Sequence, residues 1–156
     1  MVPICHTIQR ACHANDRGWQ DIVLAAPPHH VDLTVTDLER SVEFYHQVLT
    51  ELGFECIPVD PGDAPCWEIR GDLPTFGIAL HRARSNARHD RFAAGLNHLA
   101  FRAGSRAEVD LFHRFLSGRH IKVLDAPAEY DYTPGYYAVF FADPDGLKLE
   151  LVYEPH

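Results

Sequence analysis

The sequence lacks several features that would place it in a membrane or secretory class. Its 156 residues contain no run of about 18 apolar residues, which argues against a transmembrane helix. The N-terminus lacks the charged-then-apolar pattern of a signal peptide, because Pro3, Cys5, His6, Gln9 and Arg10 interrupt it. These absences predict a cytoplasmic protein that has no membrane partner.

Cysteine and positive charge are also scarce. The four cysteines form no CxxC pair and follow no disulfide framework, so each is expected to be a reduced thiol. Lys and Arg number 14 against 22 Asp and Glu, and the net charge of -8 argues against a nucleic-acid surface. The apolar share of 46% fits one globular domain with its own core. Eleven histidines are many for this length, which directs attention to metal or acid–base chemistry.

Two helical segments repeat each other. Residues 41–49 (SVEFYHQVL) and 108–116 (EVDLFHRFL) share valine, acid, two large apolar residues, histidine, a polar residue, an apolar residue and leucine, 67 positions apart. In both segments the apolar residues recur at helical spacing. Asp37 and Ser105 precede them as candidate N-caps.

Strand patterns surround both helices in the same order. A strand comes before each helix and three follow it, which predicts an α+β fold of two βαβββ units. The predicted strands are 30–35, 55–59, 66–70 and 75–81 in the first unit, and 96–102, 120–124, 136–142 and 147–153 in the second. We therefore expect one domain over residues 29–156, with module one at 29–81, module two at 95–155, and an N-terminal extension at 1–28.

Strand alternation places three chemically capable side chains on corresponding faces. Successive side chains of a strand point to opposite faces, and the apolar positions of each strand should meet the helix. His30 in module one, and His98 and Glu150 in module two, fall on the opposite face. A sheet with polar side chains on that face should line a wet cleft, where a ligand can bind.

The turn at residues 143–146 (DPDG) fixes the register of the last hairpin. Proline at its second position and glycine at its fourth favour a type I turn followed by a left-handed residue. Such a three-residue loop pairs Asp143 with Leu147, and hence Phe140 with Glu150. Phe140 and Tyr136 then share the face of Glu150, whereas a two-residue loop would reverse this parity.

Three segments together resemble the vicinal oxygen chelate superfamily. They are residues 30–41 (HVDLTVTDLERS), 95–101 (GLNHLAF) and 143–151 (DPDGLKLEL). This superfamily includes glyoxalase I, fosfomycin-resistance thiol transferases, extradiol dioxygenases and bleomycin-binding proteins. The resemblance covers about four fifths of the chain and implies a U-shaped mixed sheet around a metal cleft.

Carried over by position, the resemblance implies one divalent metal on His30, His98 and Glu150. Two imidazoles and one carboxylate suit Fe, Mn, Ni or Zn. Glyoxalase I has a further glutamate on the last strand of its first module, but residues 76–81 (FGIALH) contain no carboxylate. Ala79 is expected at the matching place, and His81 is the only substitute within reach.

The expected chemistry is a metal-dependent lyase, isomerase or ring-cleaving dioxygenase acting on a small oxygen-bearing substrate that chelates the metal. Glu150 and Tyr136 are the candidate catalytic residues, and Arg102, Phe140 and Tyr136 are the candidate substrate contacts. A thiol transferase of the fosfomycin-resistance type and a metal-free drug-binding protein are the alternatives. A homodimer is a further possibility that the sequence leaves open.

Overall fold

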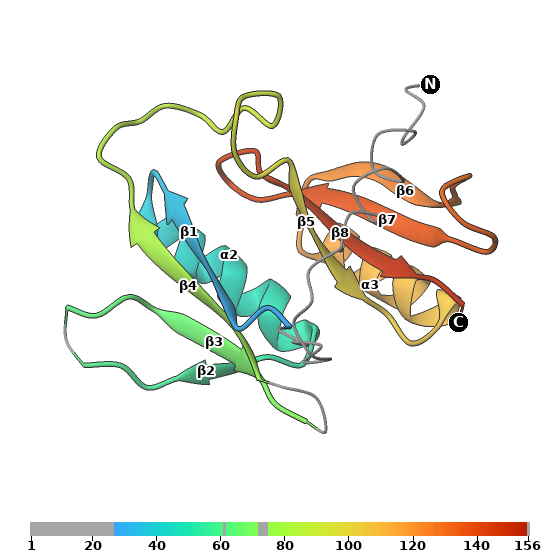
Figure 1. Ribbon diagram of the computed structural model, residues 1–156, viewed down its shortest axis with the longest axis horizontal. Coiled ribbons are helices and arrows are strands. Elements are labelled where there is room, and N and C mark those ends of the chain that lie inside the picture. The colour runs from blue at the N-terminus through green and yellow to red at the C-terminus, as the bar shows by residue number, and fades with distance from the viewer. Residues whose placement is uncertain (1–26, 61, 72–74, 156) are drawn as a thin grey trace, which may run out of the picture.

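The computed structural model describes residues 27–60, 62–71 and 75–155 and has the predicted two-module α+β architecture. Residues 1–26 lie outside this range, and the division into extension and domain stays a prediction. Figure 1 shows the modules side by side, each with one helix against its sheet. Module one contains β1 (His30–Val35), α2 (Leu38–Glu51), β2 (Glu55–Ile57), β3 (Cys66–Ile69) and β4 (Phe76–Arg82). Module two contains β5 (His98–Arg102), α3 (Arg106–Gly118), β6 (Val123–Glu129), β7 (Tyr137–Ala142) and β8 (Lys148–Tyr153).

Both helices begin at the predicted capping residues. The side chain of Asp37 accepts a hydrogen bond from the backbone N–H of Arg40, and Ser105 accepts one from that of Glu108. The Glu108 carboxylate in turn accepts from the backbone N–H of Gly104. These bonds satisfy N–H groups that have no partner inside the first turn of a helix. The helices extend beyond the predicted segments at both ends.

The strands form two four-stranded mixed sheets with the same topology. The strand order is β1-β4-β3-β2 in one sheet and β5-β8-β7-β6 in the other, and the first and last strands of each module pair in parallel. In the described part of the chain, β1 and β5 are therefore edge strands. The inner strands β4 and β8 have neighbours on both sides, so side chains on them are covered more fully.

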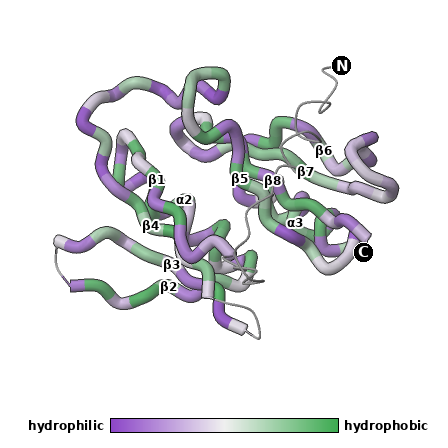
Figure 2. The backbone as a smooth tube through the Cα atoms, in the orientation of Figure 1, coloured by the Kyte–Doolittle hydropathy of each residue, from purple (hydrophilic) through white to green (hydrophobic). Residues whose placement is uncertain are grey.

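One hydrophobic core joins the modules. It contains the helix-facing residues of both sheets, including Leu33, Val35 and Ile78 from module one and Phe101 and Leu149 from module two. Figure 2 shows β7 in the green of apolar residues, whereas much of the link between the modules is purple. The helix-side faces of the two sheets thus share one interior, and the opposite faces point away from it.

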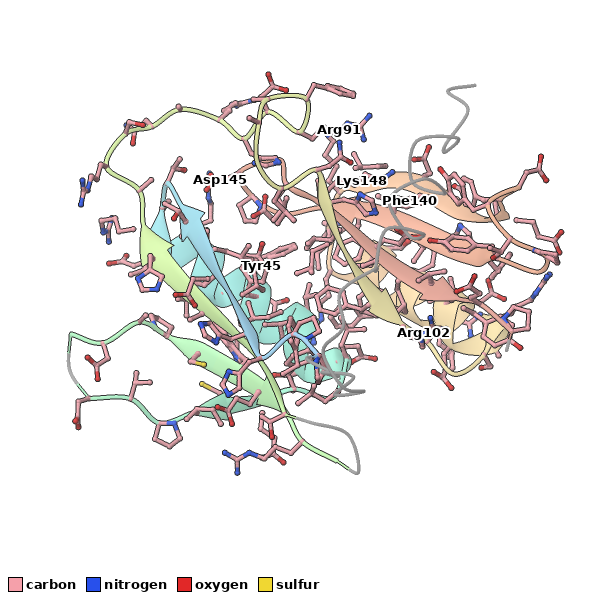
Figure 3. The ribbon with its side chains drawn as sticks, in the orientation of Figure 1. Tyr45, Arg91, Arg102, Phe140, Asp145 and Lys148 are labelled. Atoms are coloured by element: carbon pink, nitrogen blue, oxygen red, sulfur yellow. The ribbon has the colours of Figure 1, made fainter. Side chains whose placement is uncertain are left out.

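Polar contacts reinforce the junction between the modules. The Asp145 carboxylate accepts hydrogen bonds from the backbone N–H of Thr36 at 2.6 Å and from its hydroxyl at 2.5 Å. It also pairs with Arg40 at 2.9 Å. The hydroxyl of Tyr45 on α2 donates to Asp143 at 2.9 Å, and Figure 3 shows Tyr45 on the side of α2 that faces module two. The β7–β8 turn therefore anchors module two on the start of module one.

The turn itself has the predicted form. The backbone N–H of Asp143 donates to the carbonyl of Leu147, and Gly146 has a φ of +94°. Only glycine takes this left-handed conformation without strain. Phe140 pairs with Glu150, as the three-residue loop requires.

The strand predicted at residues 120–124 begins later in the chain, at Val123. Before Val123 the chain still completes the end of α3, because the N–H of Ile121 donates to the carbonyl of Leu116 and His120 has a φ of +56°. β6 starts at Val123 and runs to Glu129 with irregular register. Pro127 is tolerated in it because β6 is an edge strand of the described sheet.

Candidate metal centre

His98 and Glu150 meet on the outer face of module two. The His98 Nε2 lies 3.3 Å from Glu150 Oε2. The Tyr136 hydroxyl donates to Glu150 Oε1 at 2.5 Å. Both carboxylate oxygens are thus engaged, and the side chain of Glu150 is only 1% exposed.

The strand register explains why Glu150 is buried. It lies on the inner strand β8, where Ala100 of β5 flanks it on one side and Phe140 of β7 on the other. Phe140 is 2% exposed and forms a small apolar cluster with Ala138 and Val152, against which Tyr130 and Tyr136 pack. The carboxylate therefore lies in a largely dry setting, although its strand face is turned away from the main core.

Asn97 determines which nitrogen of His98 carries the proton. The Asn97 side-chain amide donates to the carbonyl of Arg91 at 2.9 Å, which leaves its Oδ1 to accept. The His98 Nδ1 lies 3.1 Å from that oxygen and is therefore the donor. The Nε2 of a neutral His98 consequently has its lone pair toward Glu150. Two acceptors that face each other at 3.3 Å need a positive charge between them, either a proton or a metal ion.

Tyr136 remains a hydroxyl donor under ordinary conditions. Burial, and then the hydrogen bond to Glu150 and its charge, raise the pKa of Tyr136 far above its ordinary value of 10.0. Its ring also packs edge-on against Tyr132 at 5.2 Å. Tyr136 is therefore a protonated, oriented group beside the carboxylate.

His30 belongs to a different face. It is exposed on β1, where its Nδ1 lies 2.9 Å from the Nδ1 of His29. Within residues 27–60, 62–71 and 75–155, no three His, Cys, Asp or Glu side chains form a group able to hold a metal. One chain brings together two of the three predicted ligands, and the complete set of His30, His98 and Glu150 stays a prediction.

The packing of the modules explains this separation. Each ligand lies on the strand face opposite to the helix, and the helix sides of both sheets meet in the common core. Within a single chain the two ligand faces therefore turn away from each other. Strand alternation identifies these faces correctly but does not determine whether they meet.

The other candidate residues have defined places. Ala79 on β4 pairs with Asp32, and His81 lies 3.3 Å from the Asp32 carboxylate rather than beside His98. Arg102 shares the strand of His98 and pairs with Glu154 at 3.4 Å. Phe140 is covered by Lys148, whose Nζ lies 3.5 Å from the ring centre, and Figure 3 shows the two side by side. Phe140 therefore supports Glu150 from a buried place.

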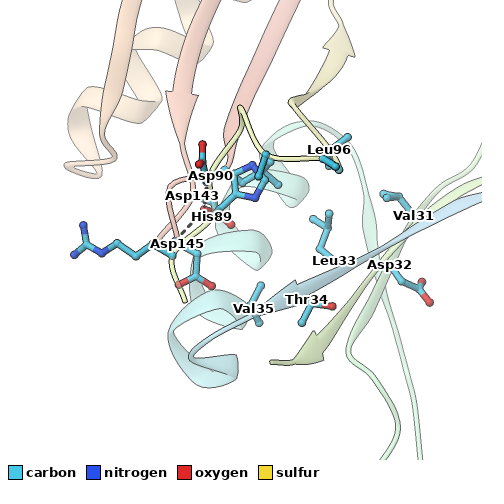
Figure 4. A pocket seen from close by; sticks show the side chains of 15 residues that line it. Val31, Asp32, Leu33, Thr34, Val35, His89, Asp90, Leu96, Asp143 and Asp145 are labelled. Atoms are coloured by element: carbon cyan, nitrogen blue, oxygen red, sulfur yellow. Dashed lines mark hydrogen bonds between the residues drawn. The ribbon is translucent and has the colours of Figure 1, made fainter. Parts of the chain in front are cut away.

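A separate cleft of about 460 Å³ lies between β1, the link and the β7–β8 turn. Figure 4 shows Asp143, Asp145 and His89 around it. The two carboxylates already accept hydrogen bonds that fix the turn and join the modules. Residues from both faces of β1 line this cleft, and neither His98 nor Glu150 does.

Sequence reasoning gave no role to Asn97 or Lys148. Asn97 immediately precedes the ligand in the chain, where an amide able to orient an imidazole is a usable signal. Lys148 lies on the same strand face as Glu150, and the alternation that selected Glu150 also selects it.

Residues 28–151 match the family model of the Glyoxalase/Bleomycin resistance protein/Dioxygenase superfamily, and the chain belongs to this superfamily, that of the vicinal oxygen chelate fold. The Bacillus subtilis (strain 168) protein YqjT, itself uncharacterised, is 34% identical over 130 residues, which are 80% of this chain and 96% of YqjT. A 2-epi-5-epi-valiolone epimerase from an Actinomyces species is 30% identical over 151 residues, with 84% of this chain and 81% of the epimerase covered. A glyoxalase/bleomycin resistance protein from Albidiferax ferrireducens has 27% identity and a TM-score of 0.59, with 81% of this chain and 98% of that one covered.

In the described part of the chain, neither helix is long and apolar enough to cross a membrane.

Proposed function

We propose that the protein is a metal-dependent enzyme that moves a proton on a small oxygen-bearing substrate, as an isomerase or epimerase does. The observation that supports this most is the connected set Asn97, His98, Glu150 and Tyr136. It combines an oriented imidazole, a buried carboxylate and a protonated phenol. The 2-epi-5-epi-valiolone epimerase among the relatives favours this chemistry over oxidative ring cleavage.

The residues present fit a divalent cation. Metal–nitrogen and metal–oxygen bonds of about 2.1 Å allow two ligand atoms to lie up to about 4.2 Å apart. The 3.3 Å between His98 Nε2 and Glu150 Oε2 is within that span. A buried carboxylate also needs a partner of opposite charge. Imidazole and carboxylate ligands together suit Fe, Mn, Ni or Zn.

The third ligand in this proposal is His30 of a second copy of the chain. His30 and His98 occupy equivalent places at the start of β1 and β5, and both side chains are exposed. A two-fold dimer would set module one of one chain against module two of the other. Each dimer would then contain two equivalent sites, each in a cleft between the two chains.

The roles of the residues follow from their contacts. A divalent cation at this place supplies Lewis acidity toward a substrate oxygen. The Tyr136 hydroxyl donates its proton to Glu150 at 2.5 Å, so its oxygen can accept a hydrogen bond from a substrate hydroxyl. Arg102 lies on the same strand face as His98, and its partly exposed side chain suits an anionic group of the substrate. Glu150 offers one oxygen as a ligand, and its other oxygen, which accepts from Tyr136, would take the proton that leaves the substrate.

Metal content and oligomeric state test the site. We expect close to one divalent ion per chain in a wild-type dimer, measured by elemental analysis and light scattering. His98→Ala and Glu150→Gln should lose the metal and keep the fold, because a domain of this size does not need a metal to fold. His113→Ala, which removes a histidine from α3, is the matched control. Unchanged metal content in His98→Ala would refute the proposed centre.

Solvent exchange tests the reaction. In deuterated water, the metal-loaded protein should exchange the proton next to the carbonyl of a small hydroxyketone, as followed by NMR. Tyr136→Phe should slow this exchange by about a hundredfold and leave the metal stoichiometry unchanged. Oxygen uptake with catechols would instead indicate a dioxygenase, and thiol addition to an epoxide a thiol transferase. Ligand binding without metal would indicate a drug-binding protein.

The missing β4 carboxylate gives a further expectation. Ala79 takes its place, so isomerisation of the methylglyoxal–glutathione hemithioacetal should be poor. Robust turnover of that compound, measured by its absorbance, would contradict this expectation and implicate His81.

A further inference from the structure

A carboxylate on β3 lies across a glycine from His30. Gly77 of β4 pairs with His30 of β1 on one side and with Glu68 of β3 on the other. Residues paired directly across neighbouring strands point to the same face, so His30 and Glu68 share one face. The neighbour of Glu68, Trp67, is 1% exposed on the helix side and donates toward His46 of α2, which confirms the direction of Glu68.

Gly77 leaves the space between these two side chains open. A Cβ at Gly77 would lie 3.6 Å from the Cβ of His30 and 3.7 Å from the Cγ of Glu68. The imidazole and the carboxylate therefore rise on both sides of a position that has no side chain. Strands about 4.8 Å apart put the two Cα atoms roughly 10 Å from each other. A histidine and a glutamate can bridge that span through a shared cation, with bonds of about 2.1 Å each.

We infer that Glu68 is a fourth ligand of the divalent cation and enters the site together with His30. This inference rests on the proposed function, because His30 must first be a ligand. Module one would then contribute one histidine and one glutamate, as module two does with His98 and Glu150. The carboxylate that β4 lacks would come from β3 instead, through the gap at Gly77.

Glu68 is paired with a cationic side chain, Arg70, which a metal ion could displace. Arg70 donates to Glu68 Oε2 at 3.0 Å through Nη2 and at 3.3 Å through Nε. The Arg70 side chain is 60% exposed, whereas that of Glu68 is 28% exposed. A guanidinium held mostly in solvent can be displaced at small cost, because such surface pairs are worth little.

Calorimetric titration of the full-length protein with Ni²⁺ tests the assignment. Glu68→Gln should weaken Ni²⁺ binding by about tenfold or more, since it keeps the size of the side chain and removes the charge. Glu55→Gln is the matched control, because Glu55 pairs with Glu68 one strand further from His30 and should leave the affinity unchanged. Gly77→Val should weaken binding as Glu68→Gln does, because it fills the gap with a residue that strands favour.

A substitution at Arg70 should change the Ni²⁺ affinity in the opposite direction. Arg70→Met should strengthen Ni²⁺ binding by about threefold in the wild type, and this gain should vanish in the Glu68→Gln background. Equal affinities of wild type, Glu68→Gln and Glu55→Gln, with binding still lost in His98→Ala, would refute Glu68 as a ligand and leave the proposed centre intact. Wild-type protein that binds no Ni²⁺ would refute both.

Discussion

The two modules share a topology but differ in how they present the face that carries their candidate ligands. In module two the part of that face on β7 and β8 is closed: Glu150, Phe140 and Ala138 are buried, and aromatic side chains pack against them, whereas His98 on β5 is exposed. In module one it is open, and His30 and His81 on it are exposed. Among the described residues, the ligand face is thus held in place by its neighbours in module two and is exposed in module one.

This difference agrees with a centre divided between two chains. The closed face fixes a ligand pair through hydrogen bonds that need no further protein. The open face holds polar groups that a second surface would have to bury. Interior sites work best when their ligands are held in place by surrounding contacts. The proposed dimer supplies such a surface to module one.

The largest expected effect tests the closed face. Phe140→Ala should destabilise the protein by about 3–5 kcal/mol, because it opens a cavity beside Glu150. His81→Ala, on the open face, should change the free energy of unfolding by less than about 0.5 kcal/mol. Denaturant unfolding of both variants measures the contrast. Similar losses for the two would mean that the faces do not differ as described.

A smaller effect concerns the junction that positions the modules. Burial raises the pKa of Asp143 above its ordinary value of 3.8, against the lowering effect of its hydrogen bonds from Tyr45, Leu147 and Asp145. A raised pKa in the folded state favours folding when Asp143 is protonated, and that contribution is lost as the pH rises through the raised pKa.

Wild type should therefore gain stability relative to Asp143→Asn as the pH is lowered from about 7 to below the ordinary pKa. Denaturant unfolding of both proteins across this range measures the difference. A difference that moves the other way would show that the hydrogen bonds to Asp143 outweigh its burial.

The smallest effect is expected at the edge of the same junction. Arg40→Met removes the ion pair with Asp145, and the Arg40 side chain is 51% exposed. Solvent screens such a pair, so the loss should be about 0.5 kcal/mol and should shrink further in high salt. Thermal unfolding at two salt concentrations provides the measurement. A loss above about 2 kcal/mol would show that the junction depends on this pair far more than its exposure implies.

Much of the fold could be predicted because local patterns determine it. Asp37 and Ser105 cap their helices as expected, and the turn at residues 143–146 sets the pairing of Phe140 with Glu150. Strand alternation also places His98 and Glu150 together correctly. Each of these inferences depends on neighbours in sequence or on one hairpin.

The remainder depends on packing that a local pattern does not contain. Alternation identifies the face of His30, but the relative placement of the modules follows from the core that their helix sides share. The shift of β6 follows from how α3 ends at His120, a residue with no strong turn signal. The role of Gly77 becomes visible only when β1 and β3 are known to flank it.

The most direct test of the account mixes two inactive variants. In the proposed dimer, His30→Ala and His98→Ala each damage both sites, but a mixed dimer combines both defects in one site and leaves the other with all its native ligands. The two proteins, unfolded and refolded together in equal amounts, should regain roughly a quarter of an ion per chain by random pairing. Each variant refolded alone should bind none. A mixture that also binds none, from proteins that refold as dimers, would contradict a centre shared between two chains.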